Sequence, residues 1–139
     1  MTRFESDAES TSPVEREARR EAESSGDPYL VWRDPSGHHR VFTLGAEWDR
    51  AAIGRSLMAD ICLHQDAEVS RVHAQLEHVG DDWALVDDGL SRNGSFINGE
   101  RIESRRRLAD GDELRFGDTV MRFRAPFQLG EDTLVPRPS

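Results

Sequence analysis

The sequence contains no lysine, and all 18 of its basic residues are arginine. Several catalytic sites depend on a lysine amine, among them the phosphate-binding loop of nucleotide hydrolases, the strand lysine of protein kinases and Schiff-base cofactor sites. The absence of lysine excludes these enzyme classes. Exclusive use of arginine is also typical of a GC-rich genome, and we expect a bacterial source.

Cysteine and long apolar runs are also nearly absent. The single cysteine, Cys62, can form no internal disulfide, which fits a reducing compartment, and its apolar neighbours predict a small buried side chain instead of a reactive thiol. No apolar run approaches the roughly 20 residues that a membrane span needs, and the first residues are acidic, unlike a signal sequence. We therefore expect a cytoplasmic protein with no membrane partner.

The charge balance restricts the possible ligands. A formal net charge of -9 argues against general binding of nucleic acid, which requires a basic surface, so any anion site must be local. The five histidines and one cysteine show no zinc-site spacing. We predict no metal and no cofactor.

The apolar content, 36%, is low for a chain that is globular throughout. Residues 1–27 are mostly charged, and they predict a disordered acidic tail with a possible short helix that begins at Ser12-Pro13, where Ser12 is the N-cap. We expect a folded domain over residues 28–126 and a flexible C-terminal tail over residues 127–139.

The middle of the chain consists of short strand-like runs separated by turn signals. The strongest turn signal is Asn98-Gly99, and Gly80-Asp81 and Gly117-Asp118 also predict tight hairpins. With no long helical period, this pattern predicts an all-β sandwich or barrel. The expected strands are 29–33, 39–44, 51–54, 60–63, 74–79, 82–87, 95–97, 101–102, 113–116 and 119–124. The expected core is Trp32, Phe42, Ile53, Leu76, Trp83, Leu85, Phe96, Leu114, Phe116 and Phe123.

Polar motifs lie at the turns between these strands, where a rigid sheet can present them to a partner. They are Gly54-Arg55, Ser70-Arg71-Val72-His73, Ser91-Arg92-Asn93-Gly94-Ser95 and Asn98-Gly99. Arginines and a serine hydroxyl supply hydrogen-bond donors, and a forked guanidinium matches the geometry of phosphate. The motifs predict a site for an oxyanion.

In this order the motifs resemble the forkhead-associated (FHA) domain over roughly residues 28–126. The resemblance implies a β-sandwich of about ten to eleven short strands whose loops bind phosphothreonine peptides, with a Ser/Thr protein kinase as a further partner and no enzymatic activity. It also implies a role for each motif residue. Arg55 would grip the phosphate, Ser70 would hydrogen-bond it and Asn93 would hold the peptide backbone, while Arg71 and Arg92 occupy neighbouring contact positions. Gly54, His73, Gly94 and Asn98 would support the loops.

Two other functions are compatible with the sequence. Ser70 and His73 with Asp87 or Asp88 suggest a hydrolase triad, but the sequence has no Gly-x-Ser-x-Gly elbow. Arg105-Arg106-Arg107 could bind nucleic acid or an acidic partner, although we favour a solvated turn for these three residues.

Both tails contain a threonine that a kinase could modify. Thr11 lies in a polar and acidic context, whereas Thr133 follows Glu131-Asp132 and precedes Leu134-Val135. FHA sandwiches carry their termini at the end away from the binding loops. Thr11 is 18 residues from Tyr29, at most about 60 Å of chain, and Thr133 is 8 residues from Ala125, about 27 Å. A phosphorylated Thr11 could therefore reach its own site, and a phosphorylated Thr133 would more readily bind another molecule.

Overall fold

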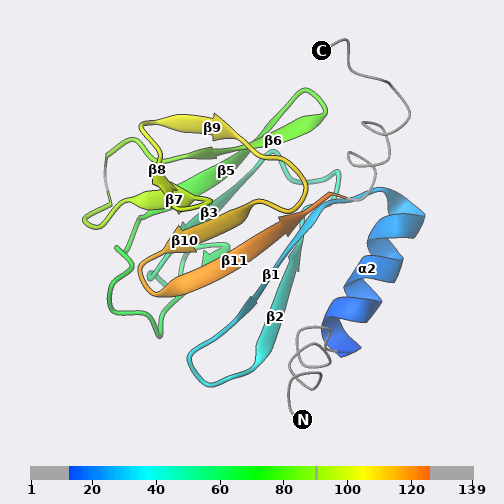
Figure 1. Cartoon of the computed structure of the whole chain (residues 1–139), viewed down its shortest axis with the longest axis horizontal. Coiled ribbons are helices and arrows are strands. Elements are labelled where there is room, and N and C mark those ends of the chain that lie inside the picture. Colours follow the sequence, from blue (N-terminus) through cyan, green and yellow to red (C-terminus); the bar gives the residue numbers. More distant parts are fainter. Residues whose placement is uncertain (1–12, 90, 126–139) are drawn as a thin grey trace.

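The computed structural model describes residues 13–89 and 91–125 (Figure 1). Within them, eleven strands form two facing sheets, which confirms the all-β sandwich. The bounds are β1 Tyr29–Arg33, β2 His39–Thr43, β3 Arg50–Gly54, β4 Ile61–Cys62, β5 Ala74–Val79, β6 Asp82–Val86, β7 Ser95–Ile97, β8 Glu100–Arg101, β9 Arg105–Arg107, β10 Glu113–Phe116 and β11 Thr119–Arg124.

The strand order is β2-β1-β11-β10-β7-β8 in one sheet and β4-β3-β5-β6-β9 in the other. Every pair is antiparallel except β3 with β4, which run parallel. Short hairpins join sequential strands, and Gly80 and Gly117 turn two of them with positive φ angles of 64° and 60°. The predicted hairpin glycines are thus confirmed. Within these residues, no helix has the length and apolar character that crossing a bilayer requires.

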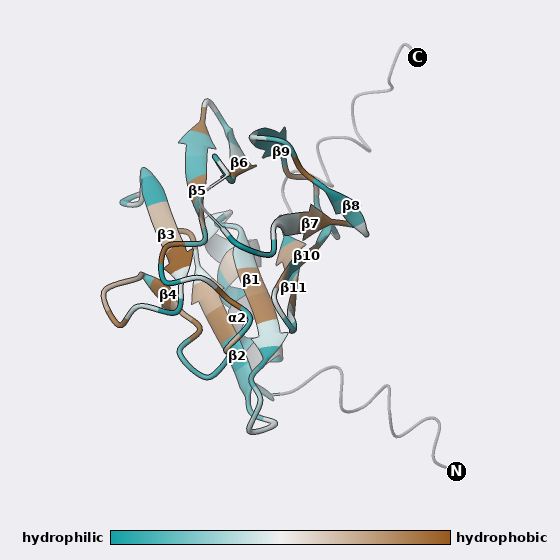
Figure 2. Cartoon of the chain, turned by 90° about the vertical axis from the view of Figure 1, so that its left-hand side faces the viewer, coloured by the Kyte–Doolittle hydropathy of each residue, from teal (hydrophilic) through white to brown (hydrophobic). Residues whose placement is uncertain are grey.

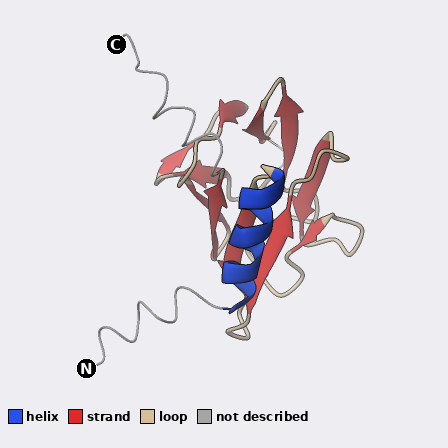
Figure 3. Cartoon of the chain, turned by 90° about the vertical axis from the view of Figure 1, so that its right-hand side faces the viewer, coloured by secondary structure: helices blue, strands red, loops and turns tan. Residues whose placement is uncertain are grey.

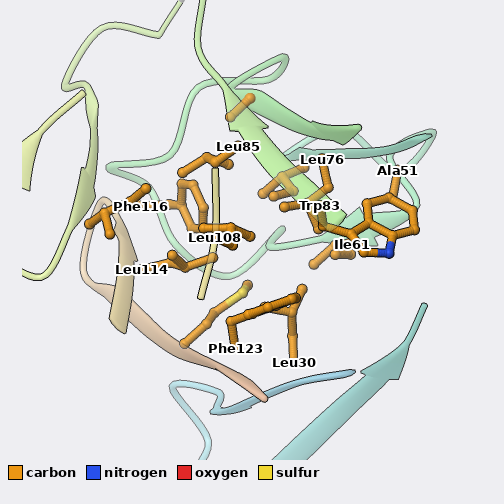
Figure 4. Close-up of a cluster of buried hydrophobic side chains, with 14 of the residues drawn as sticks. Leu30, Ala51, Ile61, Leu76, Trp83, Leu85, Leu108, Leu114, Phe116 and Phe123 are labelled. Atoms are coloured by element: carbon orange, nitrogen blue, oxygen red, sulfur yellow. The ribbon is translucent and has the colours of Figure 1, made fainter. Parts of the chain in front are cut away.

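The core lies between the two sheets, where alternate side chains of each strand point inward (Figure 4). Leu30, Leu76, Leu85, Leu114 and Phe116 are each fully buried. Seven of the ten predicted core side chains are buried, and Trp32 and Phe42 are partly buried against the same cluster. The sandwich is held by this apolar layer.

Phe96 does not belong to the core, contrary to the prediction. It alternates with the buried Ser95 and Ile97 and so faces outward, where the guanidinium of Arg115 lies 4.3 Å from its ring centroid. Arg115 is the cross-strand partner of Phe96, so the aromatic ring is shielded by a cation–π contact instead of by the core. Cys62 is only half-buried, because β4 is an edge strand.

Arg105–Arg107 form a strand, and the prediction of a solvated turn is wrong. This strand, β9, pairs with β6 at the edge of its sheet. Its three guanidiniums reach carboxylates elsewhere in the fold, at 3.1 Å for Glu77, 3.1 Å for Glu100 and 3.5 Å for Asp82. Charged side chains are a common way to protect an edge strand from pairing with another chain.

Helix α2 spans Pro13–Ser25 and packs against β1 and β2 (Figure 3). It begins at Pro13 as predicted, while the proposed N-cap, Ser12, lies outside the described residues. Ala22 and Tyr29 are 1% and 0% exposed where the helix meets the sheet. The sequence suggested a marginal helix in a free tail, but the small side chain of Ala22 allows close approach to Tyr29, so this part of the chain is packed on the domain.

Candidate functional site

Three loops meet at one end of the sandwich, and they carry Arg55, Ser70, Arg71, Arg92 and Asn93. The loops join β3 to β4, β4 to β5 and β6 to β7. The amide of Arg55 donates to Ser70 O at 3.0 Å, and the amide of Ser56 donates to Arg71 O at 3.3 Å. The amide of Arg92 donates to Ser70 Oγ at 2.9 Å. The structure therefore brings Arg55, Ser70 and Arg92 together from segments up to 37 positions apart in the sequence.

Arg55 is oriented by one hydrogen bond of its own side chain. It is half-buried at the end of β3, and its Nε donates to Val69 O at 2.9 Å. Its two terminal amino groups have no partner among the described residues. Because these groups form the fork that binds two oxygens of a phosphate, Arg55 is held in place with its anion-binding end free.

Ser70 keeps its hydroxyl proton available. The Oγ atom accepts a hydrogen bond from Arg92 N, while the backbone amide of Ser70 donates to His73 Nδ1 at 3.0 Å. In the described contacts the hydroxyl itself donates to no group. The rotation of a hydroxyl is fixed by its acceptor, so an oxyanion beside Arg55 can take this proton.

His73 connects two of the loops from within. It is 1% exposed, and because Nδ1 accepts from Ser70, Nε2 carries the proton and donates to Gly94 O at 2.8 Å. Its ring packs edge-on against Phe116, with centroids 5.7 Å apart. Both ring nitrogens are thus occupied by backbone groups, and no contact joins His73 to the Ser70 hydroxyl. This arrangement is incompatible with a hydrolase triad.

Asn93 lies on the β6–β7 loop, half-buried. Its Nδ2 donates to Glu68 O at 2.7 Å and to Glu68 Oε1 at 3.1 Å. These bonds aim its side-chain oxygen away from Glu68 and leave that oxygen to accept from an incoming backbone N–H. The contact with Glu68 was not predicted for Asn93, since 25 positions separate the two residues.

Arg71 and Arg92 are exposed on either side of Ser70. In the part of the chain that the structure describes, neither guanidinium has an acidic partner, whereas the three arginines of β9 are all ion-paired. These loops therefore carry guanidiniums without acidic partners in a chain that is acidic as a whole. The arrangement offers several hydrogen-bond donors for an anion, beside the side-chain amide of Asn93, which can bind an extended peptide backbone.

Comparison with known proteins agrees with this geometry. The family model described as the FHA domain matches residues 51–117. One solved FHA domain comes from a study of phosphothreonine-dependent FHA domain interactions. It is 32% identical in sequence, with a TM-score of 0.61, and the match covers 70% of this chain and 95% of the solved chain. The FhaA FHA domain, solved in complex with the intracellular domain of Rv3910, is 32% identical with a TM-score of 0.60 and is covered over 99% of its length.

The chain belongs to the FHA family. Among its relatives are an oxoglutarate dehydrogenase inhibitor of Corynebacterium jeikeium (strain K411), 39% identical over 101 residues, and the glycogen accumulation regulator GarA of Mycolicibacterium smegmatis, 35% identical over 101 residues. Each alignment covers 73% of this chain, but it covers only 63% of the inhibitor and 58% of GarA.

Two glycines of the FHA motifs are explained by space. A Cβ atom on Gly54 would lie 2.1 Å from Arg71 O, so only glycine lets the β3 end approach the loop that carries Ser70. Gly94 has a φ of +85°, and a Cβ there would lie 2.6 Å from Arg101 Nε. The side chain of Arg101 thus covers the FHA loop beside Asn93, a position that the sequence did not single out.

Asn98 is remote from this surface and shapes a hairpin. Its φ is 51°, which confirms the expected turn at positive φ. Its side chain donates to Asp112 Oδ1 at 3.0 Å and accepts from Glu113 N at 2.9 Å. These bonds tie the β7–β8 hairpin to the segment before β10.

Asp87 shapes the β6–β7 loop through a buried network that sequence reasoning missed. Its Oδ2 accepts from Ser91 Oγ at 2.6 Å and from Ser95 Oγ at 2.7 Å, and Ser91 Oγ accepts from Gly94 N at 3.1 Å. Ser91 stood within the FHA motif but had no assigned role. The network explains it, because a carboxylate and a hydroxyl together fix the backbone that carries Asn93.

Low pH should reduce the stability that the Asp87 hydrogen bonds give to the β6–β7 loop. Burial by itself would raise the pKa of Asp87, but hydrogen bonds from Ser91, Ser95 and Gly89 N–H outweigh it and hold the pKa below its usual 3.8. A depressed pKa contributes stability that is present above about pH 4 and is lost as pH falls through the native value. We expect Asp87→Asn to lower the free energy of unfolding at pH 6 and to flatten its decline between pH 5 and pH 2, as measured by urea unfolding. An Asp87→Asn variant with the full acid slope of the natural chain would contradict this assignment.

Proposed function

We propose that this chain is a phosphothreonine-peptide-binding module in Ser/Thr kinase signalling. The observation that carries the proposal is the convergence of the free Arg55 fork, the Ser70 hydroxyl and the Asn93 amide on one surface. A phosphothreonine carries a charge near -2 and three strong acceptors, and each charge-assisted bond is worth roughly 1.5 to 3 kcal/mol. Arg71 and Arg92 add positive potential around the phosphate.

Arg55 and Ser70 would bind the phosphate, and Asn93 would bind the peptide backbone beside it. Threonine would be preferred to serine if the loops receive its methyl group in an apolar pocket, as the FHA resemblance implies. Glu68 lies beside Asn93, so we expect an acidic residue to be disfavoured at the third position after the phosphothreonine. Basic or apolar residues should be tolerated there.

The alternative, nucleic-acid or acidic-partner binding through Arg105–Arg107, has less support. All three guanidiniums already lie within 3.5 Å of carboxylates. A polyanion would have to displace these carboxylates one by one. The arginines around Ser70 have no such competition in the described residues.

The relatives suggest the class of regulator. Two are named as an enzyme inhibitor and an accumulation regulator, and we propose that this chain is likewise a non-enzymatic regulator in the bacterial cytoplasm, with its FHA unit over residues 28–126. A phosphoprotein and a Ser/Thr protein kinase would be its partners. Within the described residues, no group of histidine, cysteine, aspartate and glutamate side chains is placed to hold a metal.

The tails could make the protein its own ligand, through phosphorylation of Thr11 or Thr133, which lie outside the described residues. The docked helix changes the reach of Thr11, because Thr11 is only two positions, at most about 7 Å, from Pro13. Figures 1 and 2 place α2 on the far side of the sandwich from β3 and β4. Capture of phosphorylated Thr11 by its own chain would therefore require α2 to leave the sheet.

The proposal is tested by titrating the full chain with a degenerate phosphothreonine peptide library. Matched libraries with unmodified threonine and with phosphoserine serve as controls, and calorimetry reports the affinity. We expect binding that requires the phosphate and favours phosphothreonine. Equal binding of the unmodified library would contradict the proposal, and so would the absence of all binding.

A further inference from the structure

Three large apolar side chains stand exposed beside Arg55. Leu57 is 81% exposed, Met58 89% and Val72 63%. The described residues include two further exposed large apolar side chains, Val79 and Val120 on strands, and these are only 38% and 44% exposed. We call Leu57, Met58 and Val72 the apolar shelf.

The shelf is a fixed surface, because hydrogen bonds hold the two loops that form it. Ser56 N donates to Arg71 O, so Leu57 and Val72 each directly follow a residue of this hydrogen-bonded pair. Met58 N donates to Ser56 Oγ at 3.0 Å, and Ala59 N donates to Ser56 O at 3.0 Å. Figure 2 shows the β3–β4 loop projecting from the molecule beside β4, with a brown, apolar tip.

An apolar cluster at the rim of a charged site is a typical interface feature. Scattered exposed side chains need no explanation, but a contiguous group beside recognition residues indicates contact with a partner. The partner should then place large apolar side chains directly next to its phosphothreonine. Negative charge elsewhere in the partner segment would suit the exposed Arg71 and Arg92.

We propose that the shelf binds Leu134 and Val135 from the C-terminal segment of a second copy of this chain, phosphorylated on Thr133. This inference rests on the proposed function. The segment Glu131-Asp132-Thr133-Leu134-Val135 has acidic residues before the threonine and aliphatic residues after it. The acidic residues suit the exposed arginines of the site, and the aliphatic residues suit the apolar shelf.

The reach of the C-terminal segment favours a second copy over capture by the same chain. The loop end of β11 is near Thr119, which donates to Asp66 of the β4–β5 loop, and the strand then leads away from this end for six residues, about 20 Å. Thr133 is about 27 Å of extended chain beyond Ala125. Returning along β11 would use most of that length before the segment reached across the loops to Arg55.

The chain also contains a natural comparison peptide. Thr11 is flanked by Glu9-Ser10 and Ser12-Pro13, so it carries acidic charge without adjacent aliphatic side chains. The phosphate chemistry of the two threonines is the same. A difference in affinity between peptides around Thr133 and Thr11 therefore isolates what the shelf contributes.

The test uses the unphosphorylated full chain and synthetic peptides of residues 128–139 and 6–17, each with its threonine phosphorylated. We expect the Thr133 peptide to bind about tenfold more tightly than the Thr11 peptide, and Leu134→Ser with Val135→Ser in the peptide to remove that advantage. The protein double variant Leu57→Ser, Met58→Ser should remove the same advantage without changing the affinity for the Thr11 peptide. Val79→Ser, an exposed valine at the far end of β5, is the matched control and should change neither affinity.

Equal affinities for the two peptides, or a Thr133 advantage that survives Leu57→Ser, Met58→Ser, would overturn the inference while leaving phosphothreonine binding in place. Failure of every phosphopeptide to bind would instead refute the proposed function. Full chain carrying phosphothreonine at position 133 should sediment as a dimer or larger assembly. A monomer at concentrations well above the peptide Kd would also overturn the inference.

Discussion

Arg55→Ala is expected to weaken binding of a phosphothreonine peptide by at least about 100-fold. The terminal amino groups of Arg55 would make two charge-assisted bonds to the phosphate, together worth roughly 3 to 6 kcal/mol, and alanine supplies neither. Because tenfold in affinity corresponds to about 1.4 kcal/mol, even the lower figure exceeds 100-fold. Calorimetry with the same peptide on both proteins measures the change.

The folded state should survive this substitution, because within residues 13–89 and 91–125 the Arg55 side chain makes a single hydrogen bond, to Val69 O. Arg50→Ala is the matched control, since Arg50 is exposed at the opposite end of β3 and should leave binding unchanged. Arg55→Lys should fall between the natural chain and Arg55→Ala, because lysine keeps the charge without the fork. An Arg55→Ala chain that is folded and binds within threefold of the natural protein would remove Arg55 from the site.

His73→Ala is expected to destabilise the fold by about 3 to 5 kcal/mol. The substitution leaves Ser70 N and Gly94 O without their partners and opens a cavity against Phe116 in the interior. Because these two bonds position the Ser70 and Asn93 loops, the remaining folded protein should also bind phosphopeptide more weakly. Urea unfolding gives the first effect, and calorimetry below the unfolding transition gives the second.

His38→Ala provides the comparison, since the His38 side chain is 75% exposed and should contribute little. Loss of stability below 1 kcal/mol in His73→Ala would show that the loops hold their positions without the buried ring. Unchanged peptide affinity in a destabilised variant would assign His73 to the core alone.

The strands were predictable where turn chemistry brackets them. Asn98-Gly99 and Gly117-Asp118 mark hairpins by local backbone requirements, and such requirements can be read from neighbouring residues. Strand β9 could not be predicted in this way, since three consecutive arginines have no alternating pattern. Its carboxylate partners, Glu77, Asp82 and Glu100, come from other parts of the chain, and only the fold brings them together.

The candidate site divides in the same manner. The sequence singles out Arg55, Ser70 and Asn93 because the order of their motifs resembles the FHA pattern, and their role in binding remains a proposal. The bonds that orient them could not be predicted, since Asn93 meets Glu68 and His73 meets Gly94 only after the loops have folded. The packing of α2 against β1 could not be predicted from the sequence either, because the contact depends on a single small residue, Ala22.

The most direct test of phosphothreonine binding at these loops is an amide chemical-shift titration of the full chain with a phosphothreonine peptide. Shifts confined to the amides of Arg55, Ser70, Arg71, Arg92 and Asn93 and their immediate neighbours, absent with the unmodified peptide, are the predicted result. Phosphate-independent shifts, or shifts centred on Arg105–Arg107, would contradict the assignment of the site.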